Sequence, residues 1–565
     1  MKKHYIQLFL IALLATGSTL KAQVLPVGTP VLEDYYRRLQ LLGQLDSTIS
    51  FSIRPLSNAA LKQENIYDPE GLQNKDNSIY RSKDGKGMVQ LMPIAWNNQA
   101  ASAYPYGWND GPMIPARGFQ TYASAGIYAE YKFLSIQLRP EFVYAQNANF
   151  DGFKGMYQSD WRLWWGRNGN DIDAPERFGK GSYVRFFPGQ SSVRLNFHPI
   201  SIGISTESLW WGPGMRNSLL MSNTAPGFLH ATINTTRPIK TAIGSFEGQL
   251  VGGKLEASGF TPKVFTDDDF HEQYYRPKTD DWRYFSGLVV SYQPKWVPGL
   301  SVGLINVFTV NRDDMGKKLG DYIPFFPSGS RSSIIDPDNP KQVSDLGAQD
   351  RNFSVFARWL VPSVNFEIYG EYARNDHGWD IRDVTVLPNH SRSYVIGMRK
   401  IVPLNTGLND LLQINAEVTQ LEPPRTVSLR NTGPMYRHNV VRDGYTQLGQ
   451  LLGAGVGLGN NIQSLNVSWL RGMKELGFQL ERLVHNNDFL YRLVKDPRRN
   501  WVDLGAAFHA AWDYKNFMFT GQMQFTKAYN YQYRLEEKPA LGNFWNFKHQ
   551  DKANFYMQLG MLYRF

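Results

Sequence analysis

Residues 554–565 read Asn-Phe-Tyr-Met-Gln-Leu-Gly-Met-Leu-Tyr-Arg-Phe. Large apolar residues occupy every second position from Phe555 to Phe565, and polar residues such as Gln558 and Arg564 lie between them. Because successive side chains of a strand point to opposite faces, this pattern predicts a β-strand with one apolar face. About 9–11 residues suffice for a strand to cross a bilayer. An unpaired edge cannot lie in lipid, so we expect this strand to close a barrel against the first strand.

The same rhythm repeats upstream in pairs of runs joined by short turns. Residues 122–131 and 135–144 alternate in this way, and only Lys132, Phe133 and Leu134 separate them, which predicts a hairpin. Long polar stretches, such as residues 145–189, lie between the hairpins. Short turns at one end and long loops at the other are typical of outer-membrane barrels. Further hairpins are expected at residues 193–205, 286–310, 353–372, 393–421, 464–484 and 501–529, with one more pair of strands in 232–260 and an opening strand at 88–96.

These runs predict about 16 to 20 strands, with about 18 the best count, and an even number places both ends of the barrel on the periplasmic side. The fold class is therefore all-β transmembrane: a large antiparallel outer-membrane β-barrel. Beyond the first residues no run of about 18 apolar residues occurs, which excludes transmembrane helices. The faces opposite the apolar ones carry charges that need water or each other, so the lumen is either wet or filled by loops. These inward charges are Arg139, Glu141, Arg194, Glu367, Glu371, Glu417, Glu481 and Asp503.

The chain begins with features of an export signal. Lys2 and Lys3 precede an apolar stretch at residues 6–15, and small residues lead to Ala22, so we expect residues 1–22 to be a cleaved signal peptide. Residues 30–46 read as a helix that starts at Pro30 and carries one apolar stripe, with its polar residues elsewhere. We expect residues 23–87 to form a small periplasmic helical module, helical to about residue 85, and residues 88–565 to form the barrel.

The composition argues against an enzyme. The absence of Cys excludes disulfides, thiolate metal sites and a Cys nucleophile. No HExxH or GxSxG motif occurs, and Glu367 and Glu371, four residues apart on a strand, would lie roughly 13 Å apart, too far for glycoside cleavage. The net charge of +10 is dispersed, which argues against nucleic acid. We expect no catalytic residue, no metal and no cofactor.

Two groups of residues could bind a sugar, because flat rings cover sugar faces and amide or charged groups bind hydroxyls. The alternative for both groups is packing of loops inside the barrel mouth, and for the Trp pair we favour this structural role. The candidate polysaccharide ligands are Trp161, Trp164, Trp165, Arg167 and Asn168 in one long loop, and Trp210, Trp211, Arg216, Asn217 and Asn223 in a second.

The second loop also carries a family resemblance. Trp210 and Trp211 run into Gly-Pro-Gly, and Ser-Leu-Leu-Met-Ser-Asn follows at residues 218–223. The segment at residues 209–230 resembles the signature of the Wzi-type capsule assembly proteins of Gram-negative outer membranes, and the chain looks like a Bacteroidetes-like member. Residues 173–179, Asp-Ala-Pro-Glu-Arg-Phe-Gly, also look like a segment of that family.

The resemblance implies an 18-stranded outer-membrane barrel with a small periplasmic helical bundle and no enzymatic role. It implies binding of capsular or surface polysaccharide, and assistance in capsule assembly or retention. Expected neighbours are outer-membrane lipid and lipopolysaccharide, and outer-membrane lipoproteins. A porin-like solute channel, an outer-membrane enzyme and a scaffold of a larger outer-membrane complex stay open as alternatives.

Overall fold

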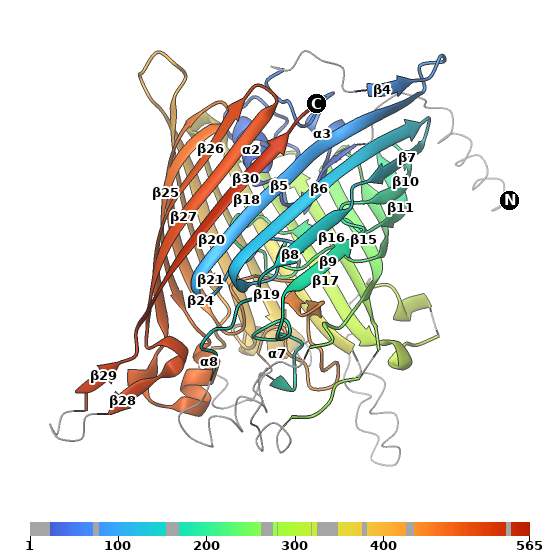
Figure 1. The fold of residues 1–565 in the computed structure, drawn as a ribbon. Helices are drawn as coiled ribbons and strands as arrows, with labels where there is room; N and C mark the ends of the chain where they lie inside the picture. The colour runs from blue at the N-terminus through green and yellow to red at the C-terminus, as the bar shows by residue number, and fades with distance from the viewer. Residues whose placement is uncertain are drawn as a thin grey trace.

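The computed structural model describes residues 23–71, 78–153, 169–260, 275–279, 281–317, 319–324, 349–375, 381–424, 434–537 and 544–565. It is a closed antiparallel β-barrel with tilted strands (Figure 1). The main sheet has 22 strand segments. Two of them are short flanking strands, and four are halves of two interrupted strands. The barrel wall therefore has 18 strands, as the sequence predicts.

Each wall strand pairs with its neighbour in sequence order, and the ring closes between β30 and β5. The flanking strands β4 (Ser78–Arg81) and β14 (Ile239–Lys240) lie beside β5 and β15. The wall strands are β5 (Gly87–Tyr106), β6 (Ala116–Tyr131), β7 (Leu134–Leu138) with β8 (Glu141–Ala145), β9 (Tyr183–Phe187) with β10 (Ser192–Phe197), β11 (Ile200–Ser205), β13 (His230–Thr235), β15 (Gly244–Leu255), β16 (Arg283–Pro294), β17 (Leu300–Asn311), β18 (Gln349–Val361), β19 (Phe366–Asn375), β20 (Arg392–Pro403), β21 (Leu411–Gln420), β24 (Asn461–Arg471), β25 (Lys474–Val484), β26 (Val502–Tyr514), β27 (Phe517–Tyr529) and β30 (Lys552–Tyr563).

The closing strand behaves as its alternation predicts. In β30, Met561 lies opposite Trp96 of β5 and Gln558 lies opposite Gln99. Phe555 and Leu559 are exposed on the outer face, whereas Tyr556 is buried inside. The barrel thus has no free strand edge. Strands surrounded by lipid require this, because lipid offers no hydrogen-bond partners for an unpaired edge.

One stretch departs from the sequence-based expectation. The polar stretch at residues 145–189 contains the strand β9, which continues in line with β10 after an interruption at residues 188–191. Four of the five residues of β9 are apolar or aromatic. Pro188 cannot donate a ladder hydrogen bond, so the strand breaks there and its first half is too short to show alternation clearly.

The outer wall is apolar along its whole circumference. Exposed large side chains such as Ile204, Ile396 and Phe508 lie on the outward positions of their strands. Near the short turns, Trp296, Trp359 and Trp512 are exposed, as expected of an interfacial aromatic girdle. Inside, all eight charged residues that the sequence places inward are buried, and this prediction is confirmed.

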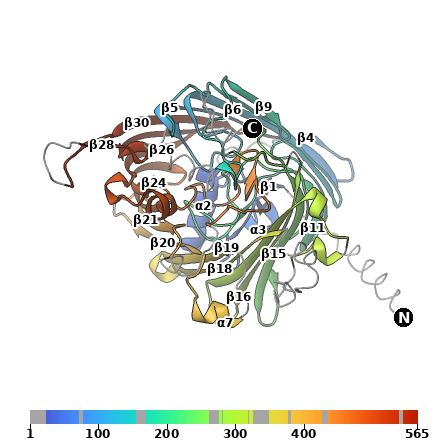
Figure 2. The same cartoon turned by 90° about the horizontal axis from the view of Figure 1, so that it is seen from below.

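The N-terminal segment lies inside the barrel at the end where the turns are short (Figures 1 and 2). Its helix α2 (Pro30–Leu41) starts at Pro30 as predicted but ends five residues early, because Gly43 adopts a left-handed conformation. The polar residues Arg37, Arg38 and Gln40 are buried, since the inner wall faces them. Besides α2, the segment contains β1 (Val24–Leu25), β2 (Ile53–Arg54), β3 (Leu56–Ser57) and the helix α3 (Asn58–Leu61), so less of it is helical than the sequence predicts.

The long loops gather at the opposite end, which Figure 1 shows at the bottom. Here this end is called the loop end, and the other the turn end. In outer-membrane barrels the short turns face the periplasm. The loops contain α7 (Ile381–Val386), α8 (Asn487–Phe489), the hairpin of β28 (Leu535–Glu537) and β29 (Phe547–His549), the hairpin of β22 (Thr446–Gln447) and β23 (Gln450–Leu451), and short helical turns at Arg312–Asp314, Leu319–Asp321, Leu490–Val494, Pro497–Arg499 and Tyr531–Tyr533; one further such turn, Pro362–Val364, lies at the turn end.

Candidate functional site

The tryptophan-containing loop between β11 and β13 folds into the lumen and meets the N-terminal segment there. Its strand β12 (Trp210–Trp211) pairs with β2. The Trp211 ring is fully buried, and its indole Nε1 donates a hydrogen bond of 2.8 Å to Gln249 on the inner wall. The Arg54 guanidinium lies 4.4 Å from the Trp210 ring centre. The Trp pair therefore joins a loop from one end of the barrel to a segment from the other.

Inward carboxylates of the wall hold the backbone of this loop. Glu417 accepts hydrogen bonds from the amides of Met215, Arg216 and Asn217 at 2.8–3.0 Å. Glu371 accepts from the Leu219 amide at 3.1 Å. A buried carboxylate that accepts several N–H groups is satisfied without water, so these charges fix the loop in place.

A second loop, residues 434–460, packs on the first. The Tyr436 hydroxyl donates to the Leu219 carbonyl at 2.6 Å, and the Tyr445 hydroxyl donates to the Leu220 carbonyl at 2.7 Å. The buried residues of both loops form one hydrophobic cluster with inward residues of β15 to β20. The two loops together plug the lumen from the loop end.

The helix α2 plugs the lumen from the turn end through a buried ionic network. Glu367 of β19 forms ion pairs with Arg37 of α2 at 2.9 Å and with Arg358 of β18 at 2.5 Å. Arg399 of β20 pairs with Asp34 of α2 at 2.5 Å. Because all of these groups are buried or nearly so, removal of one partner would leave a charge without compensation.

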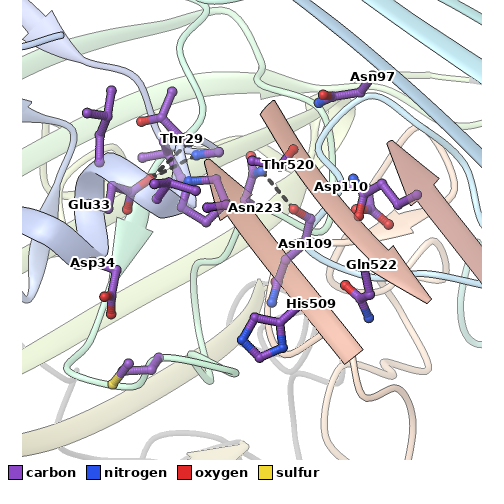
Figure 3. A pocket seen from close by; sticks show the side chains of 18 of the residues that line it. Thr29, Glu33, Asp34, Asn97, Asn109, Asp110, Asn223, His509, Thr520 and Gln522 are labelled. Carbon is purple, nitrogen blue, oxygen red and sulfur yellow. Dashed lines mark hydrogen bonds between the residues drawn. The ribbon is translucent and has the colours of Figure 1, made fainter. Parts of the chain in front are cut away.

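Between the two plugs and the wall lies a cavity of about 500 Å³ (Figure 3). On one side it is lined by α2 and by the loop that joins β5 to β6, and on the other by inner faces of β5, β21, β24 to β27 and β30. Neutral amides and hydroxyls dominate the wall side: Asn97, Gln413, Asn415, Asn466, Gln479, Thr520, Gln522 and Gln558.

Charged groups around the cavity are mostly paired. Arg216 forms an ion pair of 2.9 Å with Glu481, and its guanidinium stacks 4.0 Å from the Trp108 ring centre. His509 lies 3.1 Å from Glu475. Burial raises the pKa of the Asp110 carboxyl to about 7, although nearby Arg216 lowers it. Uncharged donors and acceptors that line a cavity suit water or a polyhydroxylated ligand.

The structure places the second group of sequence-predicted ligands inside the plug. Trp211 and Asn217 are fully buried, and Asn217 donates to Thr419 at 3.1 Å. Trp210, Arg216 and Asn223 line the cavity. The other group, Trp161, Trp164, Trp165, Arg167 and Asn168, lies outside the described residues.

The sequence analysis missed the cavity residues contributed by residues 106–110, Tyr-Gly-Trp-Asn-Asp. Asn109 accepts a hydrogen bond of 3.0 Å from Asn223 through its carbonyl. A short Gly- and Asn-containing stretch reads as an ordinary turn, and no local signal distinguishes an inward-folded turn from a surface turn. His509 and Gln522 stand at inward positions of their strands, so alternation could have found them.

An apolar belt, a charged interior and a closed ring of 18 strands define an outer-membrane β-barrel, here one with a plugged lumen. A family model described as Capsule assembly protein Wzi matches residues 98–541. The chain belongs to the Wzi capsule assembly family, which confirms the resemblance seen in the segment at residues 209–230.

Among solved structures, the chain is similar to Wzi of Escherichia coli, described as an outer-membrane protein involved in group 1 capsule assembly and as a carbohydrate-binding β-barrel. The two are 12% identical with a TM-score of 0.60, and the match covers 96% of this chain and 100% of that one. OccAB2 of Acinetobacter baumannii is 10% identical, with a TM-score of 0.38 over 83% of this chain and 97% of its own. OccK2 (OpdF) of Pseudomonas aeruginosa is 8% identical, with a TM-score of 0.38 over 84% and 97%. Comparison with curated proteins returned no match.

Two features are absent from the described residues. None of their helices is long and apolar enough to cross a bilayer. In the same part of the chain, no three His, Asp or Glu side chains gather closely enough to hold a metal ion.

Proposed function

We propose that this protein binds capsular or surface polysaccharide at the loop end of the barrel and assists capsule assembly or retention at the outer membrane. Family membership supports the proposal, and so does the plugged lumen. Inside the barrel the Trp-containing loop meets the N-terminal segment through the pairing of β12 with β2, and the loop at residues 434–460 packs on it. A barrel plugged in this way offers loops rather than an open pore for ligand binding.

Further parts of the proposal follow from the sequence. We propose a role without catalysis, export through a cleaved signal peptide at residues 1–22, and a periplasm-facing position for residues 23–87. Outer-membrane lipid and lipopolysaccharide surround the belt, and lipoproteins are candidate partners. Trp161, Trp164, Trp165, Arg167 and Asn168 stay proposed polysaccharide ligands, and so do Trp210, Arg216 and Asn223 at the cavity.

The test is retention of surface glycan by cells that lack the protein. We expect deletion to lower cell-attached polysaccharide and to raise the polymer released into the medium, without a change in the total. The wild-type gene should restore retention. Unchanged partition of the glycan in the deletion strain would refute the capsule role.

Conductance can distinguish the proposed polysaccharide-binding barrel from the alternative, a porin-like solute channel. We expect purified protein in planar bilayers to give little steady current, because α2 and two loops block the lumen. A large steady current from the intact protein would favour the channel. Co-purification with an outer-membrane lipoprotein, together with unchanged glycan retention in the deletion strain, would favour the scaffold.

A further inference from the structure

Three arginines lie together on the outer face of the barrel at the loop end of β18, β19 and β20. In β19 the side chains of Glu367 and Glu371 are buried inside and Ile368 is exposed outside, so alternation puts Arg374 on the outer face. Arg374 lies directly opposite Arg392 of β20. Arg351 of β18 stands two positions from the residue that opposes Arg374, at a diagonal of roughly 7–8 Å.

The outer faces of these strands change in character from the apolar belt towards the loop end. Trp359, Ile368 and Met398 are exposed and apolar. Tyr372 lies opposite Tyr394 two outward positions nearer the loops, and Arg374 and Arg392 follow at the next outward position. Hydrocarbon, then amphipathic rings, then cations is the order in which acyl chains, the interface and charged headgroups occur in a leaflet.

Arg374 and Arg392 lack the ion-pair partners that buried arginines normally have among the described residues, although Arg392 stacks 5.3 Å from the Tyr394 ring centre. Arg374 is only 8% exposed, yet its Nε and Nη1 atoms have no hydrogen-bond partner, and neither does Nη1 of Arg392. Within the described chain, no carboxylate forms an ion pair with Arg374 or Arg392. Like charges directly opposite on neighbouring strands destabilise a sheet, and a buried unpaired guanidinium is costly. An anion bound between them would offset both costs.

The acid that follows the neighbouring strand β21 is engaged elsewhere. Glu422, which follows β21, accepts hydrogen bonds from Asn461 at 2.5 Å and from Asn487 at 2.8 Å. Arg351 donates to the side chain of Gln349 and stacks 5.5 Å from the Phe308 ring centre, which holds its charge beside the other two arginines. Asp321 is a carboxylate whose charge acts on Arg351. Three arginines against this one acid leave an excess of positive charge at the rim of the belt.

We propose that Arg351, Arg374 and Arg392 bind a phosphate group of a phosphorylated glycolipid of the outer leaflet, of the lipid A type. The planar guanidinium fork matches phosphate oxygens in a two-point geometry. The acyl chains of the same lipid would lie on the apolar wall below the tyrosines. This site is separate from the loop-end surface of the proposed function and does not depend on polysaccharide binding.

The test compares lipid binding by the full-length protein in detergent micelles. The probes are bisphosphorylated lipid A, the same lipid with both phosphates removed, and inorganic phosphate. We expect the variant Arg374→Gln with Arg392→Gln to bind bisphosphorylated lipid A about tenfold more weakly than the wild type. The matched control is Arg482→Gln, an exposed outward arginine of β25 that lies opposite Gln463 and Leu504 rather than another arginine, and it should change affinity less than about twofold.

The dephosphorylated lipid should bind wild type and double variant equally. Equal affinity of the double variant and the wild type for bisphosphorylated lipid A would overturn the proposal. So would inorganic phosphate that binds as tightly as the lipid, because the site would then be one for free phosphate. Should the Gln variant fail to fold, Arg374→Lys with Arg392→Lys keeps the charges and removes the fork; weaker lipid binding supports the site, and unchanged binding contradicts it.

Discussion

Gly212 shows why the Trp-Trp-Gly-Pro segment needs a glycine at its third position. Its φ of +125° lies where side chains are rarely tolerated, and an added Cβ would stand 2.7 Å from Oε2 of Glu371 and 2.8 Å from Oγ of Ser218. We expect Gly212→Ala to lower the free energy of unfolding by roughly 1–3 kcal/mol, measured by thermal denaturation in detergent. Gly43→Ala is the control, because Gly43 also has a positive φ but no atom within 4 Å of the added carbon. Equal losses in the two variants would show that crowding at Gly212 is unimportant.

Asp110 should make stability depend on pH. Its pKa in the folded chain is about 7, raised by burial, whereas an unfolded Asp titrates near about 3.9. Between these values the folded state holds a proton that the unfolded state has lost, so stability falls as the pH rises through this window. We expect Asp110→Asn to raise Tm at pH 8 and to have little effect near pH 4. A Tm difference that is constant with pH would contradict the raised pKa.

At the scale of elements, α2 shows how one residue of the wall anchors a whole plug. Glu367→Gln removes the carboxylate that pairs with Arg37 and Arg358. We expect a loss of about 3–5 kcal/mol, because buried cations would be left unpaired. The released helix should become open to trypsin at Arg37 and Arg38, whereas the two loops should keep the conductance in planar bilayers low.

The control for this variant is Glu256→Gln, which removes the acid of an exposed ion pair with Lys254. Exposed pairs contribute roughly 0–1 kcal/mol, so digestion and conductance should stay at the wild-type level. A Glu367 variant whose helix stays protected from trypsin would show that the remaining contacts of α2, including the ion pair of Asp34 with Arg399, are enough to hold it.

The strands could be predicted from the sequence because each one is a local pattern. Alternation gave the inward charges Glu371 and Glu417 and the outward positions of β30, and short turns gave the hairpins. The strand β9 was not predicted because the chain breaks at Pro188, and α2 is shorter than predicted because of Gly43. Both effects come from backbone geometry, which the alternation of apolar and polar residues does not report. Element boundaries are set by such single residues.

The plugged lumen of the whole barrel could not be predicted from the sequence. The contacts that build it join residues far apart in the chain, such as Trp211 with Gln249 and Arg37 with Glu367. Nothing local to Arg37 or Arg38 distinguishes a polar helix face that meets solvent from one that meets a charged inner wall. Only the assembled barrel could therefore distinguish an open lumen from a plugged one. The cavity beside Asp110 is the part of the lumen that the two plugs do not fill.

The apolar belt leads to a prediction about the whole barrel. Exposed positions in water usually tolerate a charged side chain, whereas exposed positions that face lipid do not. Phe508, at the middle of β26, is 51% exposed, and Val440, in an inward-folded loop region, is 43% exposed. In water both positions would accept Arg at little cost. If lipid surrounds the barrel, Phe508→Arg should cost about 2–4 kcal/mol, and Val440→Arg should cost far less. Urea titration of folding into phospholipid vesicles measures both values, and equal tolerance of Arg at the two positions would mean that the apolar wall does not face hydrocarbon.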